Sequence, residues 1–292
     1  MPLRGSLKHS DTSPMLQRTP RHWTVLDAPS NLGLRQLRPG VEPGAWRLAD
    51  ALRACGLVER LGGRDAGRVE APLWTEMFEN RSRIPAYTVQ LAQRLGDLLR
   101  AGEKPLVLGG DCSILLGAML ALRRRGQYGL AFLDGHLDFR VEDVDAVAGE
   151  DLAVVTGRAE DALADIDGLR PYVRDEDVVA LGDRSGDTIP ATIRVIGLDA
   201  LRRGEWAVPG LPYWIHLDAD VLRLDAVDSP QPDGLSYDEL TEVLRRLVPG
   251  AVGMHVTIFD PDKDPDGSAA HALTDCLVSG LAPAATRSRS RS

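Results

Sequence analysis

Seven short apolar runs recur along this chain, and stretches with helical periodicity separate them. The runs cover residues 23–30, 104–110, 129–135, 177–183, 193–199, 212–220 and 251–261. Runs of this length and composition suit strands that are buried on both faces of a sheet. Helical patterns cover residues 43–61, 84–102, 113–126 and 236–250. Because strand and helix alternate, we predict an α/β fold with a mainly parallel sheet.

Size and composition limit what such a chain does. It has 292 residues, of which 43% are hydrophobic and 26% charged, which fits a single large domain over residues 22–284. The formal net charge of −9 argues against a nucleic-acid surface, which needs clustered Lys and Arg. The sequence also predicts no membrane association. Chemistry on a small molecule is therefore favoured.

The two ends of the chain differ from the rest in composition. Residues 1–21 are basic and rich in Ser, Thr and Pro, and residues 285–292 alternate Arg with Ser. We expect both to be disordered tails, because neither has the apolar residues that a core requires. The three cysteines, Cys55, Cys112 and Cys276, are widely spaced. An odd, sparse set fits a reducing compartment, so we expect a cytoplasmic protein.

Acidic residues follow two of the predicted strands. In "FLDGHLDF", Asp134, His136 and Asp138 occupy alternate positions, and in "HLDAD" Asp218 and Asp220 repeat the spacing. Residues two apart in an extended segment face the same side, and ligands collect at the carboxyl ends of parallel strands. These groups would repel one another unless cations lay between them. Carboxylates with an imidazole suit manganese or a similar divalent ion.

Three motifs together carry a resemblance to a known family. "GGDCS", "DGHLD" and "HLDAD" resemble, in order and approximate spacing, the metal-binding signatures of the arginase, agmatinase and formiminoglutamase (ureohydrolase) superfamily. Residues 27–48 resemble its opening strand and glycine loop, and the likeness runs from about residue 22 to 284. It implies a three-layer α/β/α sandwich around an eight-stranded parallel sheet, and a homo-oligomer. It also implies two Mn²⁺ ions per chain, whose bridging hydroxide attacks a guanidino or amidino carbon.

The resemblance also implies roles for individual residues. Asp134 and Asp218 correspond to carboxylates that bridge the two metals, and His136 and Asp220 to ligands of one metal. Asp138 corresponds to a ligand of the other metal that also takes up the hydroxide's proton and passes it to the leaving amine. We therefore predict Asp138 and His136 as catalytic residues.

Cys112 is the first departure from the family pattern. The first signature normally ends in a histidine that completes one metal site, and Cys112 stands at that position. A metal would lower the pKa of a thiol enough for the thiolate to bind it. A cysteine at a strand end is otherwise usually a small buried apolar side chain. Two interpretations stay open: Cys112 is a ligand, or the first metal site is weak or empty.

Two further departures concern the substrate. Ala148 stands where the family often has an active-site histidine, and Ile258 stands where arginases and agmatinases have a glutamate that binds the guanidinium. An isoleucine cannot pair with a cation. Either another acid takes over or the substrate is not a simple guanidinium; the candidate substrate-binding acids are Glu150, Asp151 and Asp187.

Arg140 directly follows "DGHLDF", at a position that faces the pocket mouth in the family. An Arg there suits a substrate carboxylate, because its guanidinium forms paired hydrogen bonds; the alternative is a solvated surface side chain. His216, just before "LDAD", is either an outer partner of a metal ligand or a core histidine.

Two functions follow from these observations. The first is a metal-dependent hydrolase of linear carbon–nitrogen bonds in amidino, guanidino or formimino groups, with a substrate other than plain arginine. The second is a ureohydrolase fold with lost or altered chemistry that binds a ligand or regulates a partner. Cys112, Ala148 and Ile258 favour the second. The cluster of mutually repelling ligands favours the first, since it would destabilise a metal-free fold.

Overall fold

The computed structural model describes residues 22–282 apart from 37–38, 76 and 142–145. Both predicted tails lie outside the described residues. Within the described part, eight strands form one parallel sheet in the order β2-β1-β3-β8-β7-β4-β5-β6. The predicted α/β class is confirmed, and the sheet is parallel throughout. No helix in the described ranges is long and apolar enough to cross a membrane.

Seven of the strands lie within the predicted apolar runs. The strands are β1 (Trp23–Ala28), β2 (Arg64–Arg68), β3 (Lys104–Gly109), β4 (Gly129–Leu133), β5 (Val178–Asp183), β6 (Arg194–Gly197), β7 (Tyr213–Asp218) and β8 (Ala251–Thr257). The strand β2 was not predicted, because its sequence RDAGR is polar and mostly exposed at the edge of the sheet. Backbone pairing with β1 forms it instead of an apolar pattern.

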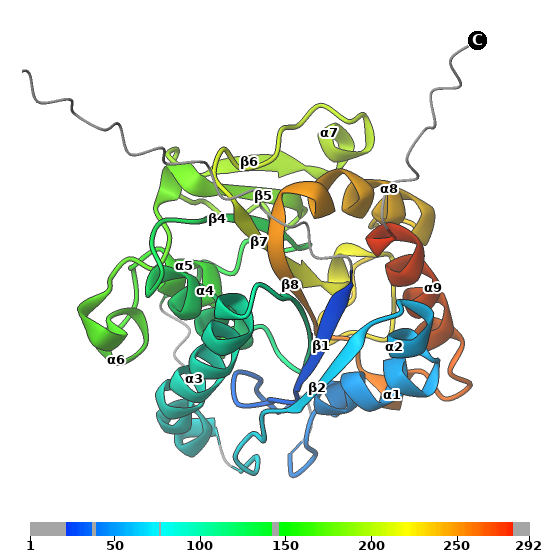
Figure 1. Cartoon of the computed structure of the whole chain (residues 1–292), viewed down its shortest axis with the longest axis horizontal. Helices are drawn as coiled ribbons and strands as arrows, with labels where there is room; N and C mark the ends of the chain where they lie inside the picture. The colour runs from blue at the N-terminus through cyan, green and yellow to red at the C-terminus, as the bar shows by residue number, and fades with distance from the viewer. Residues whose placement is uncertain (1–21, 37–38, 76, 142–145, 283–292) are drawn as a thin grey trace, which may run out of the picture.

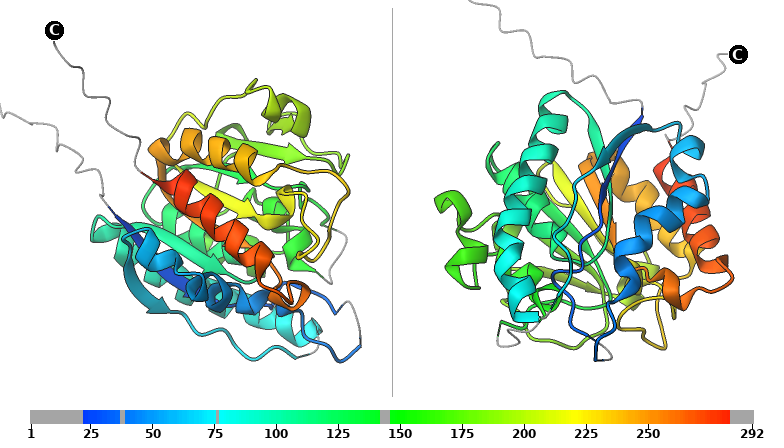
Figure 2. Two further views of the ribbon diagram at one scale, coloured as in Figure 1. Left: turned by 90° about the vertical axis from the view of Figure 1, so that its right-hand side faces the viewer. Right: turned by 90° about the horizontal axis from the view of Figure 1, so that it is seen from below.

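Helices cover both faces of the sheet, which gives three layers (Figures 1 and 2). One core lies between the sheet and α1, α2, α7, α8 and α9, and the other between the sheet and α3, α4, α5 and α6. The helices are α1 (Leu48–Ala54), α2 (Leu57–Arg60), α3 (Met77–Arg100), α4 (Ile114–Arg123), α5 (Asp151–Val155), α6 (Asp161–Ala164), α7 (Leu198–Arg202), α8 (Tyr237–Leu247) and α9 (Ser268–Leu281). The predicted three-layer sandwich is confirmed.

The largest differences between predicted and observed helix boundaries lie in two places. The stretch 43–61 is divided into a 3₁₀ helix (Gly44–Arg47), α1 and α2. Gly56 separates the last two with a φ of 76°, a left-handed conformation that ends a helix. The helix α3 begins at Met77, before the predicted residue 84. Its first residues were missed because they are mostly polar, and the apolar periodicity used for the prediction begins only at Ile84.

The sheet order brings the predicted motifs together. Strands β3, β8, β7 and β4 are consecutive neighbours at the centre of the sheet. Since all strands run parallel, their carboxyl ends meet at one edge, where ligands of open α/β sheets bind. "GGDCS" follows β3 and "DGHLD" follows β4, while "HLDAD" ends β7.

The turn after β3 explains the paired glycines of "GGDCS". A Cβ atom on Gly110 would lie 1.8 Å from the backbone oxygen of Ser30, closer than any real contact. The neighbouring Asp111 is fully buried and accepts hydrogen bonds from Ser30 Oγ (3.1 Å), the Gly33 amide (3.1 Å) and the Ser113 amide (2.7 Å). These contacts hold the backbone on each side of Cys112 in one conformation.

We predict that Gly110→Ala lowers the free energy of unfolding by at least about 2 kcal/mol, because the new methyl group would overlap backbone that cannot move aside. Urea unfolding followed by circular dichroism measures the loss. The control is Gly210→Ala, which has open space around the added carbon and should leave stability unchanged. Equal stability of the two variants would contradict the steric requirement at Gly110.

Candidate metal centre

The side chains of the centre lie at the carboxyl edge of the sheet, on the last residue of one strand and on the segments that follow three strands. Cys112 lies between β3 and α4, and the segment after β4 carries Asp134, His136 and Asp138. The strand β7 ends at Asp218, and Asp220 follows in the 3₁₀ helix Ala219–Val221. The structure brings these six residues together in groups whose candidate ligand atoms lie within 4.8 Å of one another.

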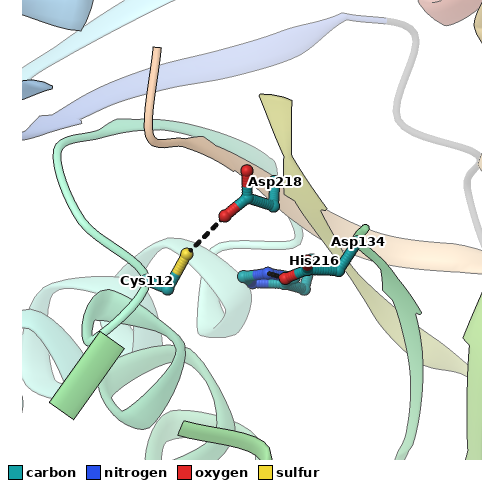
Figure 3. Close-up of side chains that lie close together, drawn as sticks. All are labelled: Cys112, Asp134, His216 and Asp218. Atoms are coloured by element: carbon teal, nitrogen blue, oxygen red, sulfur yellow. Dashed lines mark hydrogen bonds and ion pairs between the residues drawn. The ribbon is translucent and has the colours of Figure 1, made fainter. Parts of the chain in front are cut away.

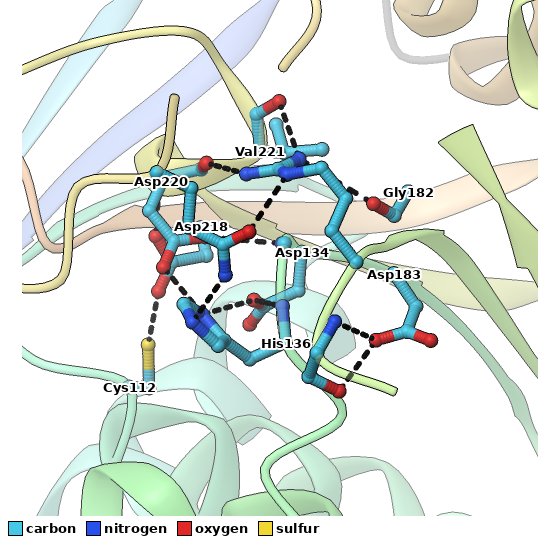
Figure 4. A network of polar contacts seen from close by, with 12 residues as sticks. Cys112, Asp134, His136, Gly182, Asp183, Asp218, Asp220 and Val221 are labelled. Carbon is cyan, nitrogen blue, oxygen red and sulfur yellow. Dashed lines mark hydrogen bonds and ion pairs between the residues drawn. The ribbon is translucent and has the colours of Figure 1, made fainter. Parts of the chain in front are cut away.

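The first group consists of Asp134, His136 and Asp220 (Figure 4). His136 Nδ1 lies 2.7 Å from Asp220 Oδ2, a contact that raises the pKa of the imidazole. On its other side, His136 Nε2 lies 2.6 Å from Gln231 Nε2, and Arg184 Nε donates to Gln231 Oε1 at 3.1 Å. The imidazole is therefore held at both nitrogens, with Nδ1 directed into the acidic group.

The second group joins the thiol to a carboxylate. Cys112 Sγ donates to Asp218 Oδ2 at 2.9 Å (Figure 3). Thr257 Oγ1 lies 3.2 Å from the sulfur. The thiol is buried, and burial together with the charge of Asp218 raises its pKa. Both effects favour the protonated thiol over the thiolate. A divalent ion between the two side chains would reverse that balance and favour the thiolate.

The third group consists of Cys112, Asp138 and Asp151. Asp138 has a φ of 43°, in the left-handed region that is rare for residues other than glycine. Such a conformation persists only where the surroundings enforce it, and it is common at functional sites. Asp151, the first residue of α5, is fully buried.

A chain of hydrogen bonds behind the centre determines which nitrogen of His216 carries a proton. Trp214 Nε1 can only donate, and it lies 3.0 Å from His255 Nδ1. His255 therefore carries its proton on Nε2, 2.5 Å from His216 Nδ1. This leaves the His216 proton on Nε2, directed at Asp134 Oδ2 at 3.3 Å. His216 thus acts as a donor to Asp134 rather than as a fourth metal ligand beside Cys112 and Asp218.

The electrostatics of the centre test whether a metal fits it. Burial, followed by the charges of neighbouring carboxylates, raises the pKa of Asp134, Asp138 and Asp218 well above the usual value. Buried acids that repel one another are costly unless a cation neutralises them. Carboxylate oxygens, an imidazole nitrogen and one sulfur are also suitable donors for a divalent ion. The residues present therefore fit the implied metals.

A cavity of about 200 Å³ opens above the centre. Ile258 is part of its wall and has a φ of 71°, a strained conformation for a β-branched residue. Ala148 also lines it, so the positions of two sequence departures face the same space as the predicted ligands. The described residues that line the cavity are Leu34, Arg35, Cys112, His136, Asp138, Arg140, Ala146, Ala148, Gly149, Asp218, Asp220, Asp228, Ser229 and Ile258.

The predicted substrate-binding residues lie in different surroundings. Arg140 lines the cavity, and its Nε atom lies 3.6 Å from Asp187 Oδ2. Glu150 is buried and accepts a hydrogen bond from Arg81. Neither Glu150, Asp151 nor Asp187 is among the described residues that line the cavity.

Sequence reasoning missed two parts of the site. Arg35 and Asp228 line the cavity, and neither belongs to one of the three metal-binding motifs. The hydrogen-bond chain through Trp214 and His255 was also missed. Its signal was the alternation of Trp214, His216 and Asp218 along one strand, but the contact with His255 requires the pairing of β7 with β8.

Comparison with known proteins identifies the family. The family model described as "Arginase family" matches residues 22–281. An arginase of Brevibacillus brevis is 30% identical over 253 residues, which cover 75% of this chain and 83% of that protein. The chain belongs to the arginase family. An arginase of Bacillus subtilis (strain 168) is 30% identical over 177 residues, 56% of this chain and 58% of that protein.

Solved structures agree with this arginase-family assignment at the level of the fold. The crystal structure of arginase from Bacillus subtilis superposes with a TM-score of 0.78 at 22% identity, covering 90% of this chain and 99% of that chain. The eight-stranded sheet and its layers are therefore those of the arginase family. Within that shared fold, the cysteine, alanine and isoleucine at positions 112, 148 and 258 surround one cavity.

The hydrogen-bond chain behind Asp134 predicts the states of two histidines. Burial lowers the pKa of His216 to about 3 and that of His255 well below its usual value, so both should remain neutral between about pH 5 and 8. Nitrogen-15 NMR of the metal-free protein should find both as the Nε2–H tautomer across this range. Trp214→Phe removes the donor to His255 Nδ1, so His255 should then populate both neutral tautomers. Titration of either ring near pH 6.5 would contradict the assignment.

Proposed function

We propose that this arginase-family protein is a metal-dependent hydrolase of linear carbon–nitrogen bonds in an amidino, guanidino or formimino group. The observation that carries the proposal is the cluster of carboxylates, imidazole and thiol at the wall of a cavity large enough for a small substrate. Family membership supports the same chemistry. The cysteine and isoleucine in the cavity wall favour a substrate other than plain arginine.

The ligands that would hold two Mn²⁺ ions surround two adjoining positions. Asp134, His136 and Asp220 would hold one ion. Cys112 and Asp138 would hold the other. Asp134 has oxygens near both groups, and Asp218 has one beside Cys112 and Asp134. When bound, the two ions would lower the pKa of a water molecule and polarise the substrate.

Two side chains of the centre are suited to proton handling and positioning. Asp138 lines the cavity, so its carboxylate would lie close enough to the reacting atoms to take up a proton and release it to a leaving nitrogen. His136 also lines the cavity, and Asp220 and Gln231 hold its ring on opposite sides. We assign the catalytic roles to Asp138 and His136.

The mouth of the cavity favours a substrate with a carboxylate. Arg140 lines it and is more than half exposed, and Asp187 lies close enough to orient its guanidinium. An Arg presents two parallel donors to a carboxylate. Ile258 offers no negative charge to a guanidinium. Of the three predicted acids, Asp187 beside Arg140 is the one we retain as a partner for a substrate cation, because Glu150 and Asp151 are buried and do not line the cavity.

Loss of catalysis is the second candidate function. It is favoured by the contact between the Cys112 thiol and Asp218, which satisfies both groups without an ion. In that case the cavity would bind a small ligand, or the protein would regulate a partner. A homo-oligomer and a cytoplasmic location remain predictions for either function.

Metal content and turnover together distinguish the two functions. We expect purified protein to hold two equivalents of manganese per chain, measured by inductively coupled plasma mass spectrometry. We also expect it to release urea, ammonia or formamide from at least one member of a panel of carboxylated guanidino, amidino and formimino compounds. The control is Asp138→Asn, which should abolish release. Folded protein that binds no divalent metal would exclude the hydrolase.

Substitution of Cys112 tests whether the thiol holds a metal. If it does, Cys112→Ser should weaken one metal site at least about tenfold, because a serine hydroxyl rarely ionises. Cys112→His supplies the imidazole of the family signature and should retain two metals. Protein loaded with Co²⁺ should show a thiolate-to-cobalt absorption band that both variants lack. If neither variant changes metal affinity or this band, the thiol is not a ligand.

A further inference from the structure

We propose that Asp151 is an additional ligand of the metal that Cys112 and Asp138 would hold, and does not contact the substrate. The proposal rests on the proposed function, because it requires that the centre binds divalent metal. It gives the metal site of this chain an oxygen donor from α5, on the segment that follows Ala148.

The first argument is that no side chain in the described part of the chain forms a hydrogen bond with the Asp151 carboxylate. Its side chain is fully buried, and neither carboxylate oxygen has a hydrogen-bond partner among the described residues. Nearly all buried polar groups in proteins are hydrogen-bonded, and an unpaired buried carboxylate is one of the costliest exceptions. Such a group therefore points to a ligand that the protein atoms alone do not supply.

The second argument is where the carboxylate lies. One Asp151 oxygen, Cys112 Sγ and one Asp138 oxygen all lie within 4.8 Å of one another. Three groups that are anionic when they ligate repel one another at this separation. A divalent ion among them turns that repulsion into attraction, and each group can reach it.

The third argument separates the metal from the substrate. Cys112 and Asp138 line the cavity, whereas Asp151 does not. A substrate in the cavity would meet Cys112 and Asp138 first, and it would have no access to a carboxylate that is 0% exposed. An ion held by those two residues would still be within reach of Asp151.

The donor set has a consequence for the choice of metal. Sulfur in place of the imidazole nitrogen favours softer ions such as Zn²⁺, while carboxylate oxygen favours harder ions such as Mn²⁺. An additional carboxylate from Asp151 offsets the preference of Cys112. Removing it should therefore weaken Mn²⁺ binding more than Zn²⁺ binding.

The test uses the full chain with Asp151→Asn, which keeps the shape of the side chain and removes its charge. Metal is removed with a chelator, and Mn²⁺ is then titrated by calorimetry, with free Mn²⁺ counted by electron paramagnetic resonance. We expect one of two sites to weaken roughly 100-fold or more, since even outer partners of a ligand change affinity 10–100-fold. Zn²⁺ affinity should fall less. The control Asp187→Asn makes the same charge change beside Arg140 and should retain wild-type metal affinity.

Thermal unfolding provides a second measurement that separates ligation from a structural role. Without metal, Asp151→Asn should unfold at a higher temperature than the wild type, because it removes an unpartnered buried acid. With saturating Mn²⁺ it should gain less in Tm than the wild type does. A metal-free variant that is less stable than the wild type would overturn the proposal, because the carboxylate would then have a partner within the protein.

The remaining outcomes distinguish failure of the proposed role of Asp151 from failure of the proposed hydrolase function. If the wild type binds two Mn²⁺ ions and Asp151→Asn binds both with unchanged affinity, only the role of Asp151 is overturned. If the wild type binds no divalent metal, the proposed function and the role of Asp151 both fail. If Asp151→Asn loses substrate affinity but retains both metals, Asp151 binds the substrate and not the metal, and the proposal is overturned.

Discussion

Repulsion among buried acids is the constraint on which the rest of this structure depends. Asp134, Asp138, Asp151 and Asp218 lie together at the carboxyl edge of the sheet, and burial and mutual charge raise the pKa of each. Folding a chain around such a cluster costs free energy that hydrophobic burial elsewhere must offset. A bound cation would neutralise this repulsion and make the cluster useful for catalysis. The buried acids are therefore the strongest support for metal chemistry.

The scaffold around the cluster is correspondingly rigid. Asp111 holds the turn before Cys112 through three hydrogen bonds, and Trp214 sets the proton positions of two histidines behind Asp134. His216 also stacks on Phe132, with ring centroids 4.4 Å apart. Partners of this kind orient ligating side chains and keep their protonation states constant. The centre is thus supported from the neighbouring strands as well as from its own loops.

The departures from the family signatures form one connected change. The side chains of Cys112, Ala148 and Ile258 line the same cavity, although they lie far apart in the sequence. Asp151, three residues after Ala148, adds a carboxylate to the group that contains Cys112. The cavity wall thus has no imidazole at positions 112 and 148 and no carboxylate at position 258, while the Asp151 carboxylate lies close to Cys112. This pattern supports altered metal and substrate preferences on an unchanged fold.

Much of the fold and part of the site could be predicted from the sequence, because their signals are local. Apolar runs determined seven strands, and the spacing of Asp134, His136 and Asp138 placed them on one side of a strand end. The polar strand β2 and the position of Asp151 could not be predicted, since both depend on contacts between distant segments. The sequence by itself determined the fold class and the chemical types of ligand. Only the tertiary structure decided which of them meet, because strand order and burial bring together residues that no local pattern connects.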